Sequence, residues 1–454
     1  MFNVMLVSLG CDKNTADSER MLGILRSRGY GLTSVPEEAD AAIVNTCCFI
    51  QSATEESISN LIELAALKKD RMKYLICAGC MAERFKDQIS EEFPEVDAFV
   101  GTMSFDSIAD VLDDLFKDDE SSESAHETVA SYKPLDKDYL DRTDVERVPT
   151  DRPYMGYLKI ADGCDKRCTY CAIPYFKGKY KSIPKESLIK EAAQLAESGV
   201  KELIIVAQET TCYGVDIYGG KKLHELLRDL SKIDGIEWIR LLYCYPEEIY
   251  PELIEEMKTN PKVLHYIDMP IQHTESEILR RMGRRIDRDG IYKVVETLRQ
   301  EIPDIAIRTT IISGFPGETE ENHQSLLKAV DELAFDHLGV FTYSCEEGTP
   351  AATFPDQVED EVKERRLDEI MSLQAEISSD NLAENVGKCF DVIVEGYMPE
   401  DDVYVGRSFK DAPDVDGMVF FESDTELYSG QIVNIEITDT NEYDMEGRVN
   451  ESSK

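Results

Sequence analysis

Three cysteines stand close together in the segment ADGCDKRCTYCAIPY, residues 161–175. Cys164, Cys168 and Cys171 give the spacing CxxxCxxC, and no fourth candidate ligand lies nearby. Structural zinc sites are closed by four ligands, commonly in two spaced pairs, so a zinc loop is the weaker alternative. Cysteine thiolates also hold iron–sulfur clusters, for which a full set is four. Three ligands leave one iron open, and we expect a substrate to bind there directly.

A second uneven set of cysteines lies upstream, at Cys11, Cys47 and Cys80. Each follows a short apolar run that we predict to be a strand, in a βαβαβ rhythm that indicates a parallel sheet. The strand ends of an open parallel sheet share one edge, where ligands bind, so thiols far apart in sequence can converge there. Cys48 and Cys77 flank this set, and we interpret them as small buried residues.

The elements that must position these cysteines fall into four segments. Residues 1–116 are predicted to form an N-terminal parallel-sheet α/β domain, and the charged, Ser-rich residues 117–150 a linker with room for an added strand. Residues 151–382 carry six predicted strands alternating with helices. They fit a partial (β/α) barrel, whose active site lies at the C-terminal strand ends, and CxxxCxxC follows the first of these strands. Residues 383–454 predict a small antiparallel β-barrel.

The segment GCDKRCTYC resembles the cluster-binding loop of radical S-adenosylmethionine (SAM) enzymes. The motifs SLGCDKNTADSE, AAIVNTCCFI and AGCMAER are similar to the three cysteine motifs of the methylthiotransferase family within that superfamily, and the C-terminal β segment is similar to a TRAM domain. The resemblance covers nearly the whole chain. It implies two 4Fe–4S clusters, one on each cysteine set, with SAM at the open iron of the CxxxCxxC cluster. A radical from SAM would remove a hydrogen atom, and the upstream cluster would carry the sulfur that replaces it.

The same resemblance implies SAM contacts from six residues: Gln208 and Glu209 end a predicted strand, Arg308 begins another, Tyr170 lies between two cluster cysteines, and two glycines, Gly314 and Gly317, lie in SGFPGET. Gln208 and Glu209 would meet the methionine amino group, and the guanidinium fork of Arg308 would pair with the carboxylate. Tyr170 would pack near the adenine, and the two glycines of SGFPGET would let backbone approach the ligand. An ordinary ion pair, core packing and a tight turn are the open alternatives.

The family has two branches with different substrates. One modifies an adenosine of tRNA, and the other modifies the β-carbon of an aspartate in small-subunit ribosomal protein twelve. Lys13 after Asp12, and the segment RSFKDAPDVDG at residues 407–417, resemble the ribosomal branch. Residues 383–454 carry 18 acidic and 5 basic side chains, which would repel an RNA backbone and attract a basic protein. We therefore predict the ribosomal protein as substrate, tRNA as the alternative, and an electron donor as a further partner.

The bulk composition is strongly acidic, with 91 Asp and Glu against 49 Lys and Arg and a net charge of −42. No run approaches the ~18 apolar residues that cross a bilayer, and the start MFNVMLVSLGC lacks a basic leader. Clustered cysteines in such a chain predict a reducing cytoplasm and no membrane partner. An electron carrier or zinc-stabilised scaffold is the alternative from another class, yet carriers normally use four protein ligands. Cys212, Cys244 and Cys345 receive no predicted role.

Overall fold

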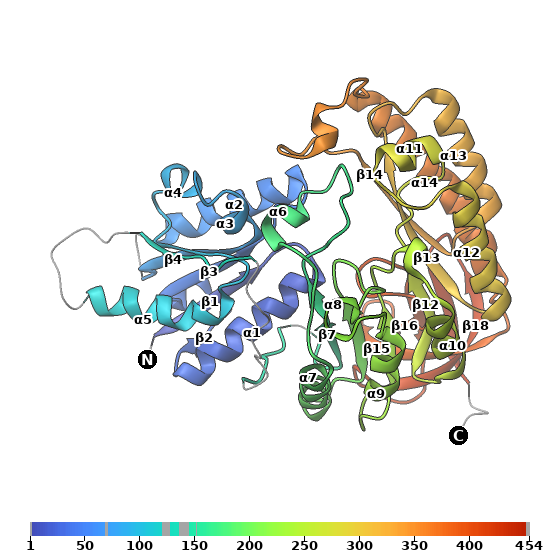
Figure 1. The fold of residues 1–454 in the computed structure, drawn as a ribbon. Helices are drawn as coiled ribbons and strands as arrows, with labels where there is room; N and C mark the ends of the chain where they lie inside the picture. The colour runs from blue at the N-terminus through green and yellow to red at the C-terminus, as the bar shows by residue number, and fades with distance from the viewer. Residues whose placement is uncertain (1, 69–70, 120–127, 136–144, 151, 451–454) are drawn as a thin grey trace.

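Two parallel sheets and a small closed barrel make up the computed structural model, which describes residues 2–68, 71–119, 128–135, 145–150 and 152–450. In Figure 1 the first sheet lies on one side, and the second sheet and the barrel lie on the other. The predicted fold class is confirmed: an N-terminal α/β domain, a partial (β/α) barrel and a C-terminal β-barrel.

Short apolar runs build the first sheet, which is parallel throughout with the order β2-β1-β3-β4-β5-β6. Its strands are β1 (Asn3–Ser8), β2 (Gly31–Leu32), β3 (Ala41–Thr46), β4 (Tyr74–Gly79), β5 (Ala98–Val100) and β6 (Val129–Ser131). Its helices are α1 (Asp12–Arg28), α2 (Gln51–Leu67), α3 (Cys80–Arg84), α4 (Ile89–Glu92) and α5 (Ile108–Asp119). Side chains alternate across the sheet. Ile76 of β4 packs in the cluster with α1 and α5, whereas Leu75 packs with α2 and α3.

Six parallel strands in the order β7-β10-β11-β12-β13-β14 form the second sheet, as predicted. They are β7 (Met155–Lys159), β10 (Glu202–Val206), β11 (Trp238–Leu241), β12 (Val263–Asp268), β13 (Ala306–Ser313) and β14 (His337–Thr342). The long helices around them are α7 (Lys185–Glu197), α9 (Leu223–Leu230), α10 (Pro251–Thr259), α12 (Arg288–Glu301), α13 (Glu320–Leu333) and α14 (Asp360–Ala383). Shorter elements are β8 (Ala161–Asp162), β9 (Lys181–Ser182), α6 (Ile173–Lys177), α8 (Val215–Tyr218) and α11 (Ser276–Arg281).

The two faces of this second sheet bury different partners. Leu158 and Leu203 belong to the large cluster that includes the surrounding helices. Tyr157 and Ile204, on the opposite face, pack in one cluster with Ala16 of α1 and Ala412 of the C-terminal barrel. The concave side of the partial barrel is therefore closed by residues from both other domains.

The C-terminal barrel closes in the order β15-β16-β17-β19-β18. Its strands are β15 (Cys389–Met398), β16 (Val403–Ser408), β17 (Val419–Glu422), β18 (Ile432–Thr440) and β19 (Met445–Val449). The pair β17–β19 is parallel and the other neighbours are antiparallel, so the prediction of an antiparallel barrel holds except at this closure. The segment MEGRV of β19 has only two apolar side chains, Met445 and Val449, on either side of Gly447, and the sequence did not predict this strand.

A buried ion-pair network fixes this barrel to the second sheet. Glu202 of β10 accepts hydrogen bonds from Arg240 (2.7 Å) and from Arg407 (2.6 Å), and all three side chains are fully buried. Arg240 also donates to the backbone oxygen of Phe409. The connection between β16 and β17 therefore docks inside the partial barrel rather than on its outer surface.

Candidate active site

The three upstream cysteines lie where neighbouring strands of the first sheet end. Cys11 directly precedes α1, Cys47 directly follows β3, and Cys80 begins α3 straight after β4. Since β1, β3 and β4 are adjacent and parallel, the three residues share one edge of the sheet. The Cys80 thiol lies 3.9 Å from Asn14 Oδ1 of α1, and Gly10, next to Cys11, closely approaches Cys47, so the three cysteines lie near one another at this edge.

Two asparagines that the sequence reasoning missed hold these strand ends in place. Asn14 donates to the backbone oxygens of Leu9 (2.8 Å) and Thr46 (3.1 Å), joining the segments that carry Cys11 and Cys47. Asn45 in turn donates to the backbone oxygen of Asn14 (3.0 Å). Both asparagines stand inside the cysteine motifs, in CDKN and NTC, so their position was the available signal.

Gly10 has no side chain, and Cys47 occupies the space that a side chain at this position would fill. The φ of Gly10 is +87°, and a Cβ at this position would lie 2.5 Å from the Cβ and 2.7 Å from the Sγ of Cys47. The left-handed conformation and the close approach both require glycine. The segment LGC therefore fixes the relative position of two of the three thiols.

Burial raises the pKa of two cysteines of this set, Cys47 and Cys80. Burial raises the pKa of Cys80 well above its usual range, while the positive charge of Lys177 acts in the opposite direction. The pKa of Cys47 is also raised by burial and lowered in part by Lys177. Metal binding would therefore release protons from these thiols. Cys48 and Cys77 are completely buried and their pKa values rise to about 12 through burial, which fits the packing role predicted for them.

The CxxxCxxC loop is closed at its base by the antiparallel pair β8–β9. The backbone N–H of Cys164 donates to the oxygen of Gly178 (3.1 Å), and the N–H of Thr169 donates to the oxygen of Met282 (2.9 Å). Burial raises the pKa of Cys164 to about 12, and the neighbouring Cys168 adds to the rise. The pKa of Cys171 is raised by burial first and then by Cys168. The three thiols thus form a second mutually interacting set.

The spacing of the thiols separates a cluster site from a zinc site. A single zinc with Zn–S bonds of about 2.3 Å holds its thiolate sulfurs roughly 4 Å apart. Among the residues that the structure describes, no three cysteine sulfurs all lie within 4.8 Å of one another. In an iron–sulfur cluster the thiolates bind different irons, so this wider spacing is compatible with a cluster. Neither set therefore forms a compact three-thiolate zinc site among the described residues, and the clusters stay a prediction.

Gln208 and Glu209 follow β10 and lie beside the CxxxCxxC loop. Gln208 donates to Asp162 at the base of that loop (3.3 Å), and Lys166 of the loop lies 4.0 Å from Glu209 Oε2. Glu209 is 1% exposed, and burial raises its pKa to about 7 although Thr211 donates to its other oxygen. Its Oε2 has no hydrogen-bond partner in the described part of the chain. A cationic group such as an amine would satisfy it, which is what the predicted SAM contact requires.

Tyr170 and the two glycines of SGFPGET meet near one another. Tyr170 is half-buried and packs edge-on against Phe315, with ring centroids 6.4 Å apart. Gly314 and Gly317 have φ values of +72° and +87°, and side chains fill the space around them: Lys363 at Gly314 and Arg281 at Gly317. Internal packing therefore accounts for both glycines, and their contact with SAM stays a prediction.

Arg308 is engaged with acidic partners. Its guanidinium donates to Asp268 (3.1 Å) and to Asp416 of the C-terminal barrel (3.2 Å), at a point where it is 16% exposed. Tyr266 donates to the same Asp416 (2.7 Å). The alternative of an ordinary ion pair therefore accounts for Arg308 in this structure, and its pairing with the SAM carboxylate stays a prediction.

The two cysteine sets belong to facing edges of the two sheets. Arg84 of α3 donates to Glu346 (2.9 Å) in the loop after β14, and the Tyr243 hydroxyl, after β11, donates to Asp12 (3.0 Å). Residues of α6, including Phe176, pack in the same apolar cluster as Cys80. Figure 1 accordingly shows α6 between the two sheets. The carboxyl ends of both sheets therefore meet at this interface.

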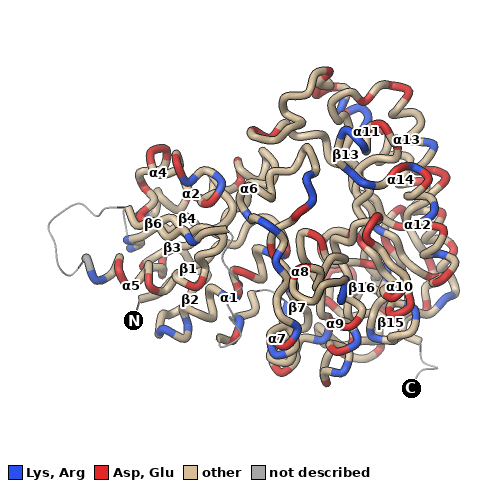
Figure 2. Tube along the Cα trace, in the orientation of Figure 1, with Lys and Arg blue, Asp and Glu red and all other residues tan. Residues whose placement is uncertain are grey.

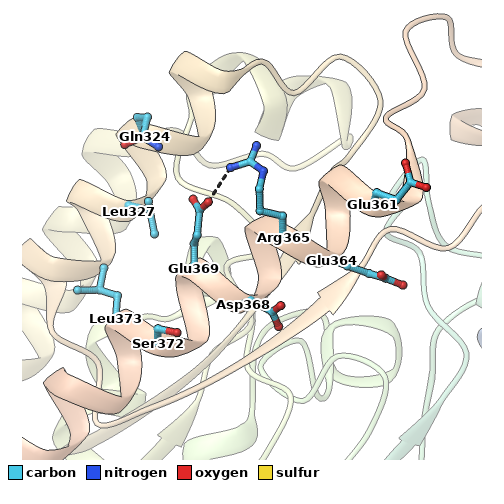
Figure 3. A pocket seen from close by; sticks show the side chains of 9 residues that line it. All are labelled: Gln324, Leu327, Glu361, Glu364, Arg365, Asp368, Glu369, Ser372 and Leu373. Carbon is cyan, nitrogen blue, oxygen red and sulfur yellow. Dashed lines mark hydrogen bonds and ion pairs between the residues drawn. The ribbon is translucent and has the colours of Figure 1, made fainter.

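A groove of about 820 Å³ lies elsewhere, between α13 and α14 (Figure 3). At its rim the ligand atoms of Glu320, His323 and Glu369 lie within 4.8 Å of one another. Arg365 donates to both carboxylates, at 2.9 Å and 2.6 Å, and His323 lies 2.7 Å from Glu369. The two carboxylates are thus paired with Arg365, and Figure 3 shows the Arg365–Glu369 pair along α14, whereas His323 Nδ1 has no hydrogen-bond partner among the described residues. The groove has no evident part in the cysteine chemistry.

Three family models match successive parts of the chain. They are "Uncharacterized protein family UPF0004" over residues 3–101, the "Radical SAM superfamily" over residues 158–330 and the "TRAM domain" over residues 386–449. The fold and the two cysteine sets thus define a radical SAM enzyme with an added N-terminal domain and a TRAM domain. Membership of that superfamily implies SAM and a 4Fe–4S cluster.

Relatives of known name cover the whole length of the chain. "Ribosomal protein uS12 methylthiotransferase RimO" of Lachnoclostridium phytofermentans is 50% identical over 445 residues, covering 98% of this chain and 99% of that protein. RimO of Acetivibrio thermocellus is 48% identical over 452 residues, covering 99% of each. The chain belongs to the RimO family of radical SAM methylthiotransferases, and the predicted family resemblance is confirmed.

Solved structures with little sequence identity share the fold. The radical SAM methyltransferase TsrM of Kitasatospora setae has a TM-score of 0.56 at 14% identity, covering 77% of this chain and 74% of that chain. The cobalamin-dependent SAM radical enzyme OxsB has a TM-score of 0.52 at 12% identity, covering 83% and 56%. At these identities the likeness concerns the fold alone. In the described ranges, no helix combines the length and apolar character needed to cross a membrane.

Proposed function

We propose that this chain attaches a methylthio group to the β-carbon of an aspartate in ribosomal protein uS12. The observation that carries the proposal is its identity of 48–50%, over the full length, to two proteins named for uS12 methylthiotransfer. The arrangement of two three-cysteine sets at one interface provides what such a reaction needs: one centre for SAM and one for sulfur.

The charge of the TRAM domain supports a protein substrate over RNA. Residues 383–454 carry a net charge of −13. Two of its basic side chains are already paired with carboxylates: Arg407 is fully buried against Glu202, and Arg448 pairs with Glu436 at the surface (3.1 Å). Figure 2 shows acidic residues along the barrel and the helices beside it. A ribosomal protein rich in Lys and Arg fits this surface, whereas a phosphate backbone is repelled.

Each cysteine set would hold one 4Fe–4S cluster with an open iron. Cys11, Cys47 and Cys80 would hold the upstream cluster, and Cys164, Cys168 and Cys171 the cluster that binds SAM. When bound, these groups and SAM supply a radical that removes hydrogen from carbon and the sulfur that takes its place. An electron donor is a further required partner.

The chain's own residues bury, orient and charge-balance this site. The thiols of Cys47, Cys80, Cys164 and Cys168 are all less than 10% exposed, so water is largely excluded around them. The buried Glu209, whose pKa is raised to about 7, offers a ligand amine one oxygen that has no hydrogen bond among the described residues, although the Lys166 ammonium lies 4.0 Å from it. Gln208 positions this segment against the base of the cluster loop through Asp162.

A parallel substrate assay tests the proposal. The anaerobically reconstituted enzyme, SAM and a reductant are offered purified uS12 in one reaction and tRNA in another, and both products are examined by mass spectrometry. We expect a methylthio group on an aspartate of uS12 and none on tRNA. Modification of tRNA alone would establish the alternative substrate. Absence of 5′-deoxyadenosine in both reactions would instead favour an electron carrier.

A further inference from the structure

Lys177 is a buried cation without a hydrogen bond. It is the last residue of α6 and is 4% exposed. Its Nζ has no hydrogen-bond partner within the described residues, and the nearest carboxylate oxygens, on Asp17 and Asp162, are each 3.8 Å away. A buried ammonium with unused N–H donors is costly. Its retention here calls for an acceptor that the side chains do not supply.

The two nearby carboxylates are already used by another lysine. Lys159 of β7 donates to Asp17 (2.5 Å) and to Asp162 (3.0 Å), and it is as buried as Lys177. The two aspartates balance the charges of both lysines. Asp162 also accepts hydrogen bonds from the Gly163 N–H and from Gln208, whereas Asp17 Oδ2, 3.8 Å from Lys177 Nζ, has no hydrogen bond within the described residues. The Lys177 ammonium is therefore electrostatically supported, with no acceptor at hydrogen-bond distance in the part of the chain that the structure describes.

Lys177 Nζ also lies 5.8 Å from the ring centroid of Phe105, and the upstream cysteines are further neighbours. Its positive charge acts on Cys47 and on Cys80, and the charges of Cys80 and Cys11 act on it in return. Its neighbour Phe176 packs in the apolar cluster that contains Cys80, and the Phe176 backbone oxygen accepts a hydrogen bond from Thr102 (2.8 Å). These contacts fix α6 beside the upstream cysteines, although α6 follows the other cysteine set in sequence.

We propose that Lys177 is a positioning residue for the upstream cluster, donating N–H groups to its sulfur atoms and offsetting its negative charge. The inference rests on the proposed function in one respect, since it requires a cluster on Cys11, Cys47 and Cys80. Hydrogen bonds and positive charge at the sulfurs of a cluster favour its reduced form. Lys177 would therefore raise the reduction potential of a cluster that the other domain ligates.

The experiment isolates the upstream cluster in the full-length chain. Cys164, Cys168 and Cys171 are changed to Ala together, so that only the upstream set can bind iron, and the protein is reconstituted anaerobically. Iron and labile sulfide are counted first, because four irons per chain establish the upstream cluster independently of Lys177. The potential is then measured by a redox titration followed by electron paramagnetic resonance.

Three variants are compared on this background. Lys177→Met removes the charge and the donors, Lys177→Arg keeps both, and Lys159→Met removes an equally buried lysine that contacts the same two aspartates. We expect Lys177→Met to disfavour reduction about tenfold, a shift of about 59 mV to lower potential for a one-electron couple. Lys177→Arg should keep the potential close to that of the parent background, and Lys159→Met should change the potential much less than Lys177→Met does.

Each outcome decides the proposal. An unchanged potential in Lys177→Met overturns it, as does an equal shift in Lys159→Met, which would assign the effect to the buried ion network. Loss of iron in Lys177→Met but not in Lys177→Arg or Lys159→Met supports it. Loss of iron in both methionine variants overturns it, since the lysines would then serve only to maintain the fold. Failure of the parent background to bind four irons refutes the upstream cluster itself.

Discussion

Glu202→Gln is the change expected to loosen the TRAM domain most directly. The Glu202 carboxylate lies between the guanidinium groups of Arg240 and Arg407, at 2.7 Å and 2.6 Å, and none of the three side chains is exposed. An amide in its place keeps the shape but removes the negative charge. Two buried guanidinium groups would then lose their shared counter-ion. Removing one partner of a buried ion pair is strongly destabilising, because the other charge is left buried without compensation.

Two estimates of the cost agree. The flanking arginines lower the pKa of Glu202 from 4.5 to about 2 in spite of burial. At about 1.4 kcal/mol per pKa unit, this corresponds to about 3 kcal/mol of stabilisation from the ionised form. Removing one partner of a buried pair typically costs about 3–5 kcal/mol. We therefore expect Glu202→Gln to lower the free energy of unfolding of this interface by about 3 kcal/mol.

The fluorescence of Trp238 can report specifically on the interface between the second sheet and the TRAM domain. Trp238 is the one tryptophan of the chain, stands two residues before Arg240 on β11, and packs in the same cluster as Ile393 and Ala412 of the TRAM domain. Its fluorescence during a urea titration, performed anaerobically, should report separation of the domains. We expect the transition of Glu202→Gln to begin at clearly lower urea than that of the unmodified protein.

A surface pair provides the matched control. Glu436 and Arg448 form an ion pair within the TRAM domain, at 3.1 Å, with side chains 38% and 66% exposed. Glu436→Gln should change stability by less than about 1 kcal/mol, as exposed pairs usually do. If Glu202→Gln is no more destabilising than Glu436→Gln, the reasoning about the buried network is wrong.

The pH dependence gives a second check on the same group. Because the pKa of Glu202 is depressed in the folded state, its stabilisation is complete above about pH 4.5 and is lost as the pH falls toward about 2. The difference between the unmodified protein and Glu202→Gln should therefore shrink through this window. A difference that stays constant down to pH 2 would contradict the assignment.

Three further predictions concern the site itself. Gly10→Ala should reduce the iron bound by the upstream set, because the added Cβ would overlap Cys47. Gly29→Ala is the control: Gly29 also has a left-handed φ of +96° but open space around it, so the iron content should not change. Counts of iron and sulfide compare the two variants, and equal counts would refute the packing argument. Cys47→Ala should leave SAM cleavage to 5′-deoxyadenosine measurable and stop methylthio transfer, and unchanged transfer would disprove the role of that set. Because the pKa of Glu209 is raised to about 7, the unmodified protein should lose about 3 kcal/mol of stability as the pH rises from about 4.5 to 7. Urea titrations of Glu209→Gln should show no such loss.

Most elements of the fold could be predicted from the local sequence pattern. The six strands of the second sheet were predicted because each is a short apolar run. The strand β19 was missed because it has only two apolar side chains, Met445 and Val449, on either side of Gly447, and the parallel pairing of β17 with β19 follows from barrel closure rather than from either segment. β6 falls in the predicted linker and extends the first sheet, as the room left for a strand allowed.

The candidate site was predictable only where its signal is local. The spacing of the cysteines and their placement after predicted strands were enough to indicate both sets. Arg84 and Lys177 were missed, because their importance arises from contacts across the domain interface. Arg308 illustrates the same limit: its position on a barrel strand was predicted, but Asp416, more than one hundred residues later, occupies part of its guanidinium.

The interface, rather than either domain, is the functional unit. Arg84 of the N-terminal domain bonds Glu346 beyond β14 and acts electrostatically on Cys171, while Lys177 of the second domain acts on the upstream cysteines. Each domain thus supplies a cation to the cysteines of the other. Separating the sheets would remove both cations at once, and would open both cysteine sets to water. The docking that brings the two cysteine sets to one interface therefore also supplies the cation that lies near each set.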